Sequence, residues 1–302
     1  MNKKLIVRIS EGLGNQLFMY ANAYSLSKKI DYDLYVDNES SYRTKNIRSY
    51  LLNNFKISAN IASQNLMYNS YKKKFFRKIK IQFDKFKNNK EFLIEKKFLD
   101  KKTCYYDYLN NACFNDNLFL EGHFESEKYF LHERKNILKE FSLINNDNFK
   151  KNNYLRNIQN ENIVSICIRQ NRYSERIGNH NDQASIEKSQ FFVKETIKYI
   201  KKAETLIEKK VSNPKYYIWS DNFTNLREYF PENKYTFVIN EEKKILNDFF
   251  LLLNCKYFIV GPTTFHWWGA WLSNFDNKFC IRPQNLNPSN NKDFWPTSWA
   301  SI

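Results

Sequence analysis

The 302-residue sequence has few glycines and prolines, no paired cysteines and no long hydrophobic run. Its five cysteines are odd in number and none forms a C-x-x-C pair, which argues against a zinc site and a disulfide framework. No window reaches the length of a membrane span, and Arg8 breaks the first apolar stretch, as expected for a strand rather than a signal peptide. The cysteine usage fits a reducing cytoplasm best, so we expect a cytoplasmic protein.

Aromatic residues and positive charge, in contrast, are abundant. The aromatic content is 17%, and a hydrophobic content of 42% allows a sizeable core. With 48 Lys and Arg residues against 32 Asp and Glu residues, the net charge of +16 suits a nucleotide, a nucleic acid or an anionic membrane as partner. Residues 72–87 hold eight basic residues and one acidic residue, a local charge of +7.

Strand and helix patterns alternate along the chain, except in residues 40–115, where no clear pattern emerges. The expected strands are residues 4–9, 34–37, 118–122, 163–168, 215–219, 235–239, 257–260 and 278–281, and the expected helices are residues 15–29, 127–144, 189–209, 224–230, 242–254 and 265–273. Such alternation predicts parallel, doubly wound α/β sheets. We therefore expect two Rossmann-like domains, residues 1–155 and 156–302, facing a cleft with ligands at the carboxyl ends of the strands.

The segment from Val260 to Leu272 offers a turn, two hydroxyl groups and three tryptophans after an apolar strand. The run Gly261-Pro262-Thr263-Thr264 before an apolar helix can direct backbone N–H groups and hydroxyls at an anion. The tryptophans lie at helical spacing, so core packing is the simpler interpretation of the helix itself.

Arg169 follows the strand that opens the second half of the chain. A guanidinium in that position can bind a phosphate or an oxyanion bidentately, although a surface arginine in a loop is the alternative. Glu175 lies close by in sequence and is a candidate general base, or else the partner of Arg172 or Arg176 in an exposed ion pair.

Other polar residues also lie at expected strand ends or in apolar runs. Gly12-Leu13-Gly14-Asn15-Gln16 follows the first strand; it allows close backbone approach to a ligand, but a tight turn without a ligand fits equally well. Asp221 ends another strand, and His123 is either a binding residue or a structural histidine. Asp248 stands in an apolar run and needs a partner, either a guanine base or a lysine such as Lys256.

In order along the chain, residues 12–21, 121–130, 163–173, 216–221 and 248–272 resemble the bacterial α-1,2-fucosyltransferases of glycosyltransferase family 11. The first of these stretches reads G-L-G-N-Q-L-F-M-Y-A, and the last contains T-F-H-W-W-G-A-W-L. This family is similar to the wider group of inverting, metal-independent fucosyltransferases with a GT-B-like two-domain fold. The resemblance implies GDP-β-L-fucose as donor, a galactose-terminated glycan as acceptor, and no cofactor or metal.

The resemblance also implies roles for individual residues. Arg169 binds the donor pyrophosphate and neutralises the departing GDP, with Glu175 as a base for the acceptor hydroxyl. Residues 263–265 (Thr263, Thr264 and Phe265) hold the phosphates and ribose, Asp248 reads the guanine edge and Asp221 supports the nucleotide pocket. Gly14, Asn15 and Gln16 lie beside the fucose and the acceptor, so that residues 1–155 form the acceptor side and residues 156–302 the nucleotide-sugar side.

The chain departs from the family at the motif H-x-R-R-x-D, where it reads Cys167-Ile168-Arg169-Gln170-Asn171-Arg172. Only the first arginine is kept, which indicates a different acceptor or donor sugar. The absence of a D-x-D motif followed by metal-ligand carboxylates fits metal-free transfer.

The basic charge suggests two interpretations, a nucleic-acid partner and a membrane surface. A nucleic-acid-binding protein should interleave basic and aromatic residues on one face, but the basic density peaks in residues 72–87, away from the strand ends, so we expect no nucleic-acid partner.

Within residues 72–87, the apolar residues recur at helical spacing among lysines; they are Phe75, Phe76, Ile79, Phe83 and Phe86. This predicts either an interfacial helix on the inner face of the cytoplasmic membrane or a helix packed on its own domain with a solvated basic face.

Overall fold

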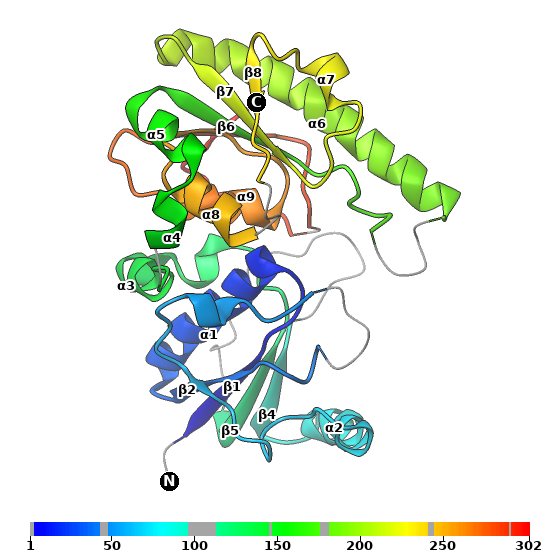
Figure 1. Cartoon of the computed structure of the whole chain (residues 1–302). Coiled ribbons are helices and arrows are strands. Elements are labelled where there is room, and N and C mark those ends of the chain that lie inside the picture. The colour runs from blue at the N-terminus through cyan, green and yellow to red at the C-terminus, as the bar shows by residue number, and fades with distance from the viewer. Residues whose placement is uncertain are drawn as a thin grey trace. The chain divides into compact units, whose positions relative to one another are not determined.

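The computed structural model describes residues 3–42, 48–95, 113–144, 147–175, 181–240, 245–289 and 291–302. The chain forms two compact units: the first is residues 1–144 with 289–296, and the second is residues 145–288 with 297–302 (Figure 1). None of the described helices is long and apolar enough to cross a membrane.

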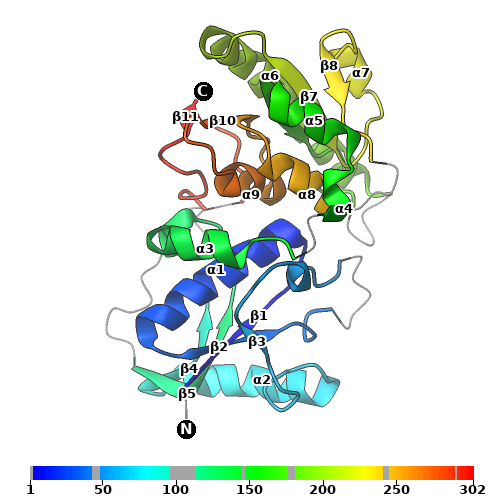
Figure 2. The ribbon, with the colours of Figure 1, turned by 60° about the vertical axis from the view of Figure 1, so that its left-hand side comes forward.

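The first unit is built on a five-stranded parallel sheet in the order β3-β2-β1-β5-β4. The strands are β1 (Lys4–Arg8), β2 (Asp33–Asp37), β3 (Asn60–Ile61), β4 (Asn89–Ile94) and β5 (Cys113–Glu121). Helix α1 (Leu13–Ile30) covers one face and α2 (Tyr71–Asp84) the other (Figure 2). Short pieces complete the unit: η1 (Leu52–Asn54), η2 (Glu127–Tyr129), η3 (Leu131–Glu133) and α3 (Arg134–Glu140).

Helix α1 begins directly after the first strand because Gly12, with extended backbone, serves as its N-cap. It ends where Asp31 adopts the left-handed conformation, and Lys28 and Lys29 in the last turn complement the helix dipole. Nearly every residue from Leu13 to Ser27 is buried, so the helix is enclosed rather than lying on the surface.

The second unit is built on a six-stranded parallel sheet in the order β11-β10-β9-β6-β7-β8. The strands are β6 (Ile163–Ile168), β7 (Lys215–Ser220), β8 (Tyr235–Phe237), β9 (Tyr257–Ile259), β10 (Phe279–Arg282) and β11 (Ala300–Ser301). The helices are α4 (Asp147–Lys150), α5 (Asn153–Asn160), α6 (Gln183–Lys210), α7 (Leu226–Tyr229), α8 (Ile245–Leu253) and α9 (Thr264–Leu272). Alternate residues of β6, such as Val164 and Ile166, pack under α6, whereas Ser165 points to the other face and bonds to α9.

Helices α8 and α9 pack closely because of one glycine. A Cβ at Gly269 would lie 2.8 Å from the Cβ of Leu252. Trp267, Trp268 and Trp271 are all buried, so the expectation that the tryptophans form core is confirmed.

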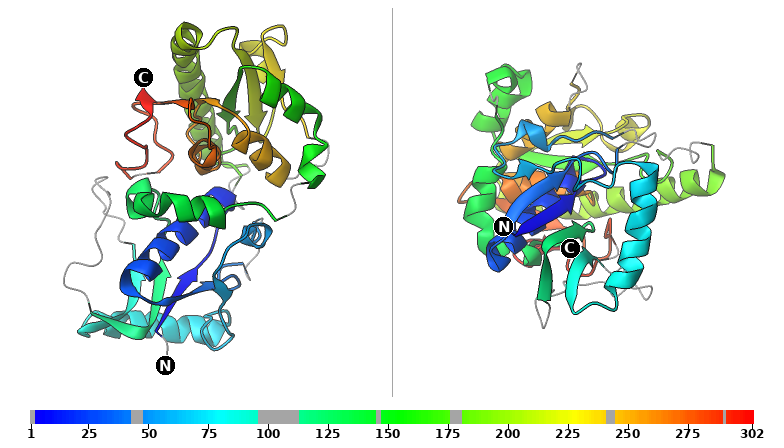
Figure 3. Two further views of the ribbon diagram at one scale, coloured as in Figure 1. Left: turned by 90° about the vertical axis from the view of Figure 1, so that its left-hand side faces the viewer. Right: turned by 90° about the horizontal axis from the view of Figure 1, so that it is seen from below.

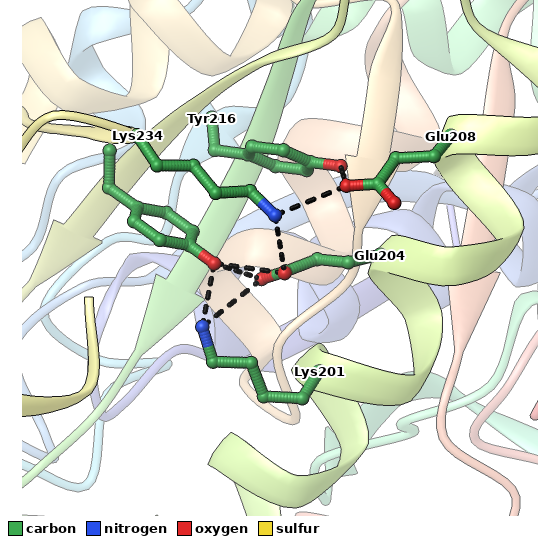
Figure 4. Close-up of polar contacts among 6 residues, drawn as sticks. Lys201, Glu204, Glu208, Tyr216 and Lys234 are labelled. Carbon is green, nitrogen blue, oxygen red and sulfur yellow. Dashed lines mark hydrogen bonds and ion pairs between the residues drawn. The ribbon is translucent and has the colours of Figure 1, made fainter. Parts of the chain in front are cut away.

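Helix α6 also carries a polar cluster that ties it to the amino-terminal ends of β7 and β8 (Figure 4). The buried carboxylate of Glu204 accepts a hydrogen bond from the hydroxyl of Tyr235 at 2.8 Å and pairs with Lys234 at 3.3 Å. Burial, and then the bond to Glu204, raise the pKa of the Tyr235 phenol. The charges and hydrogen bonds of these side chains are paired within the cluster. The cluster lies at the amino-terminal ends of the strands, so we assign it a structural role.

The parallel, doubly wound α/β class is confirmed, while several elements differ from expectation. The helix expected at residues 127–144 is wrong: Phe130, with φ −143° and ψ 6°, leaves the helical conformation and is fully buried, and the segment forms η2, η3 and α3 instead. Helix α6 starts earlier than expected because the side chain of Asp182 caps the N–H of Ser185 at 3.0 Å. Helix α2 falls in the segment where a helix was expected from the spacing of its phenylalanines, whereas η1, β3, β4 and β11 were not anticipated.

The two units also differ from the expected division at residue 155. That position lies inside α5, which belongs to the second unit, and residues 289–296 return to the first unit. Two contacts hold residues 289–296 in the first unit. Phe294 is fully buried, and its ring centroid lies 6.2 Å from that of Phe18. Asp293 forms an ion pair with Lys128 at 2.5 Å.

Candidate functional site

The second unit has a topological switch point between β6 and β9. These strands are neighbours in the sheet, but the chain continues from β6 toward β7 on one side and from β9 toward β10 on the other. In open parallel sheets, connections that diverge in this way leave a crevice outside the carboxyl ends of the strands. Arg169 follows β6 and the Gly261–Thr264 turn follows β9, so two predicted binding segments lie at this point.

The turn after β9 is fixed by a close backbone contact and a buried histidine. A Cβ at Gly261 would lie 1.9 Å from the carbonyl oxygen of Cys167, so no other residue fits. The N–H of Gly261 donates to Nδ1 of His266 at 2.8 Å, and Nε2 of the same ring lies 3.1 Å from the hydroxyl of Ser165. Burial lowers the pKa of His266 to about 3, which keeps the ring neutral and able to accept from Gly261.

The turn leads into the amino terminus of α9. Thr263 is buried, and its hydroxyl accepts from the N–H of His266 at 3.1 Å, so it is the N-cap. Thr264 and Phe265 are partly exposed, and their N–H groups have no partner among the described residues. Such first-turn N–H groups, together with the helix dipole, favour an anion. The three predicted residues therefore differ: Thr263 shapes the turn, whereas Thr264 and Phe265 present the donors.

The Arg169 side chain is partly buried and forms an ion pair with Glu175. Burial by itself would lower the pKa of Arg169, but the hydrogen bond and charge of Glu175 outweigh it, so the pKa is raised and the guanidinium stays charged. Of the two alternatives for Glu175, the structure places the carboxylate in an ion pair, and the partner is Arg169, which the sequence did not suggest; Arg176 lies outside the described residues. A base role for Glu175 remains a prediction.

Asp221 and Gln170 hold the loop that carries Arg169. The carboxylate of Asp221 accepts from the backbone N–H groups of Gln170 at 2.7 Å and Asn171 at 3.1 Å. The Gln170 amide donates to the carbonyl oxygens of Asn222 and Thr224. At the position where the family motif has its second arginine, this chain thus has an amide that joins the loops after β6 and β7.

Arg172, which the sequence did not single out for binding, joins the loops after β6 and β9. Its guanidinium donates to the carbonyl oxygens of Pro262, at 3.3 Å, and Pro288. It also lies 4.9 Å from the ring centroid of Phe192 on α6. The departure of this chain from the motif at position 172 gave a sequence signal for such a residue, but its partners are distant in sequence.

Asp248 lies in the first turn of α8 and is partly buried. Its carboxylate accepts from the amide of Asn240, whose own oxygen accepts from Asn152 at 3.0 Å. The expected lysine is elsewhere, because Lys256 lies over the ring of Tyr257 at 4.9 Å. Burial raises the pKa of Asp248 to about 6, and the bond from Asn240 offsets this only in part, so the carboxylate is short of donors.

The electrostatic environment of the Cys167 thiol, near the end of β6, shows that Asp248, Asp221 and Arg169 lie close together. Burial is the main cause of its raised pKa, followed by the negative charges of Asp248 and Asp221, and the charge of Arg169 opposes them. Three predicted site residues from three different connections therefore lie within electrostatic range of one buried atom.

The predicted residues of the first unit lie at the start of α1. Gly14 is buried and Asn15 is partly exposed. Gln16 is fully buried: its amide donates to the carbonyl oxygens of Glu11 and Ser49, both at 2.8 Å, and accepts from a third backbone group, the N–H of residue 51, at 2.9 Å. Since every bond of that amide goes to the backbone, Gln16 positions the chain near residues 49–51, and only Asn15 has exposed polar atoms for a sugar.

The first unit has its own switch point, between β1 and β5. Arg8 at the end of β1 pairs with Glu121 at the end of β5 at 2.9 Å. The backbone N–H of His123 donates to the carboxylate of Glu95 at 2.7 Å, which fixes the turn after β5. Among the residues that the structure describes, no group of three His, Cys, Asp or Glu side chains is placed to hold a metal ion.

The glycosyl transferase family 11 model matches residues 3–300. The chain belongs to this family. It is 28% identical to the O-antigen biosynthesis glycosyltransferase WbnK of Escherichia coli, over 97% of this chain and 99% of that protein. It is 25% identical to an α-1,2-colitosyltransferase of Escherichia coli, over 99% and 98% of the two chains.

The GT-B-like fold of this family 11 glycosyltransferase is similar to that of POFUT1, solved in complex with GDP. The two share 10% sequence identity with a TM-score of 0.52, over 93% of this chain and 98% of POFUT1. A solved complex of POFUT1 with GDP-fucose aligns with the same TM-score. At this level of identity the likeness concerns the fold, and the predicted roles of Arg169, Asp248 and residues 263–265 rest on the geometry described above.

Proposed function

We propose that this enzyme transfers L-fucose from GDP-β-L-fucose to a galactose-terminated glycan, forming an α-1,2 linkage with inversion at the anomeric carbon. The observation that carries the proposal is that Arg169 and the amino terminus of α9 both follow strands at the β6/β9 switch point of a family 11 chain. This combination suits a diphosphate leaving group, because it offers a delocalised cation and backbone donors to the same anion.

In this proposal the second unit binds the nucleotide. The N–H groups of Thr264 and Phe265 and the guanidinium of Arg169 hold the pyrophosphate. Asp248 accepts the N1–H and N2–H groups of guanine, which would supply the donors that its buried carboxylate lacks. Thr263 and Asp221 act indirectly, since the one caps α9 and the other holds the Arg169 loop.

The chemical step is a displacement at the anomeric carbon. The acceptor hydroxyl forms the new C–O bond as the bond to the β-phosphate oxygen breaks, and the departing GDP takes the electron pair. Arg169 and the α9 amino terminus stabilise the charge that develops on that oxygen, so no metal ion is required. The acceptor proton passes to a carboxylate base, for which Glu175 is the candidate once GDP-fucose competes for Arg169.

We propose further that the reaction takes place on the cytoplasmic side of the membrane, in the synthesis of surface polysaccharide. The support is the similarity over nearly the whole chain to WbnK, an O-antigen biosynthesis enzyme. Asn15, the partly exposed polar residue at the start of α1, is the candidate for contact with the acceptor sugar.

The test is a donor screen followed by nucleotide release. GDP-fucose, GDP-mannose and UDP-galactose are each supplied with a galactose-terminated acceptor, with and without EDTA, and the product linkage is determined by NMR. The expected result is EDTA-insensitive release of GDP from GDP-fucose and an α-1,2 product. Arg169→Ala should lower the rate of transfer at least about 100-fold, whereas Arg227→Ala, at an exposed arginine paired with Glu232, should leave it unchanged. Equal turnover by Arg169→Ala would refute the proposed leaving-group role.

A second donor is favoured by the other relative, the α-1,2-colitosyltransferase. Colitose is fucose without its 3-hydroxyl group, so a site for one can accept the other unless it binds that hydroxyl. GDP-colitose therefore belongs in the same screen. A kcat/KM for GDP-colitose above that for GDP-fucose would change the donor in the proposal and leave the nucleotide site as described.

A further inference from the structure

Helix α2 of the first unit turns most of its apolar side chains away from the core, whereas Ile81 packs against the core cluster. Phe75, Phe76 and Phe83 are between 59% and 66% exposed, Tyr71 at the first position of the helix is 93% exposed, and Phe86, just beyond its last residue, is 87% exposed. An amphipathic helix in a globular protein normally buries its apolar face. The exposed stripe includes i, i+4 and i+8 positions, and is therefore one continuous surface.

The helix is attached mainly through its polar face, together with the packing of Ile81. Arg77 forms an ion pair with the buried carboxylate of Glu121, and Lys80 pairs with Glu91 at 2.9 Å. The carboxylate of Asp84 accepts the backbone N–H groups of Glu91 at 2.8 Å and of the next residue at 3.1 Å. These contacts with β4 and β5 fix the rotation of the helix about its axis, so the outward direction of the aromatic stripe is a property of the fold.

The stripe is bordered by lysines. Lys72, Lys74, Lys78 and Lys85 form no ion pair with any residue that the structure describes. Figures 2 and 3 show α2 at the periphery of the first unit, with no other drawn element of that unit on its far side. The outer surface of α2 therefore combines exposed aromatic rings with uncompensated positive charge.

We propose that α2 is a docking surface for an anionic lipid bilayer, with the aromatic side chains between the headgroups and the lysines against the phosphates. Interfacial helices have an apolar face bordered by lysines, and each lysine near an anionic surface strengthens binding roughly fivefold. A second copy of this chain fits less well, because pairing two such faces would oppose two sets of lysines. The inference is independent of the donor and acceptor proposed above.

Vesicle sedimentation of the full-length protein tests the proposal. Vesicles of phosphatidylcholine alone are compared with vesicles that contain 30% phosphatidylglycerol, at about 0.1 and 0.5 M salt. We expect binding to the anionic vesicles only, and a strong decrease at high salt. Phe75→Ser with Phe83→Ser, and separately Lys72→Glu with Lys78→Glu, should each reduce the partition at least about tenfold.

Matched controls lie on the exposed side of α6 in the second unit. Phe191 is 65% exposed, so Phe191→Ser removes a comparable aromatic, and Lys202→Glu with Lys209→Glu reverses two exposed charges. Both controls should bind vesicles like the wild type, and all variants should keep the wild-type circular dichroism.

Three results would overturn the proposal. The first is a wild-type protein that stays in the supernatant with anionic vesicles. The second is equal binding by the wild type and the α2 variants. The third is a wild-type dimer in sedimentation velocity that Phe75→Ser with Phe83→Ser dissociates, because the stripe would then be an interface between copies of the chain.

Discussion

Replacing Asp248 with asparagine should stabilise the second unit and weaken nucleotide binding at the same time. The substitution keeps the shape of the side chain and its bond from the amide of Asn240, and removes only the negative charge. A buried carboxylate with too few donors costs folding free energy, whereas a guanine base would supply the missing donors. A residue kept for binding should therefore show opposite effects on stability and affinity.

The size of the stability effect follows from the pKa. The pKa of Asp248 rises from 3.8 to about 6 on folding, so the folded state holds its proton more tightly than the unfolded state. The free-energy cost of the charged carboxylate is absent at low pH, where Asp248 is protonated in both the folded and the unfolded state. It grows as the pH rises from 3.8 to about 6 and is constant above that, at roughly 2 to 3 kcal/mol. Asp248→Asn should recover this amount at neutral pH and only about 0.5 kcal/mol near pH 4.

The effect on binding should have the opposite sign. Loss of a charge-assisted pair to guanine costs about 1.5 to 3 kcal/mol, or roughly 10- to 100-fold in Kd. Wild-type affinity for GDP-fucose should fall as the pH drops below about 6, because the protonated carboxyl cannot accept both guanine N–H groups. GDP-fucose is the appropriate ligand, since its pyrophosphate diester does not titrate in this range. The affinity of the variant should not change with pH through this group.

Tryptophan fluorescence during urea unfolding measures the stability of the relevant unit, because five of the six tryptophans lie in the second unit and only Trp295 lies in the first. Comparing variant and wild type at each pH between 4 and 7.5 cancels the titration of other groups. Calorimetry with GDP-fucose gives the affinities, and a comparison of GDP with IDP, which lacks the 2-amino group, isolates the guanine contact.

Glu232→Gln is the control, since that carboxylate is exposed and paired only with Arg227 among the described residues. It should change stability by less than about 1 kcal/mol and leave GDP-fucose affinity unchanged. If Asp248→Asn stabilised the protein and bound GDP-fucose like the wild type, with the same preference for GDP over IDP, the guanine role would be refuted. No gain in stability at neutral pH would refute the account of the buried charge.

Four further substitutions test the site and its frame. Arg169→Ala should lower kcat at least about 100-fold, because it removes the principal cation from the leaving group, and Arg169→Lys should restore only part of that loss in a steady-state assay. Gly261→Ala should destabilise the second unit by about 3 kcal/mol or more in urea unfolding, since its Cβ would overlap the Cys167 carbonyl; a stable, active variant would contradict the packing. His266→Leu leaves the Gly261 N–H buried without an acceptor and should raise the KM for GDP-fucose as well as lower stability; an unchanged KM would show that the turn does not depend on it. Tyr235→Phe, at the opposite edge of the sheet, should cost about 1 kcal/mol in the same unfolding assay and leave kcat unchanged, so a loss of activity there would argue against a purely structural cluster.

The sequence alone determined the layered architecture and which segments end strands. Apolar runs followed by Arg169, Asp221 and the Gly261–Thr264 turn predict parallel strands with polar carboxyl ends, because periodicity and turn chemistry are local properties of the chain. The burial of the tryptophans after that turn was predictable for the same reason, since an apolar helix next to a central strand has to pack against it.

Only the tertiary structure decided the partners of these residues. The bonds of Gln16 to residues 49–51, of Arg172 to Pro262 and of Asp248 to Asn240 depend on loops that are distant in sequence or unpatterned. Glu175 was expected to pair with Arg172 or Arg176, but the folded loop brings its carboxylate to Arg169.

Helix α2 shows the same division most clearly. The spacing of its phenylalanines and lysines established an amphipathic helix but not which face meets the sheet, and an apolar face inward was the ordinary expectation. The structure has the opposite orientation, because Glu121 and Glu91, on strands later in the chain, bind Arg77 and Lys80 on the polar face of the helix. Local periodicity fixes the two faces of a helix, but which of them is buried depends on the side chains that distant strands bring against it.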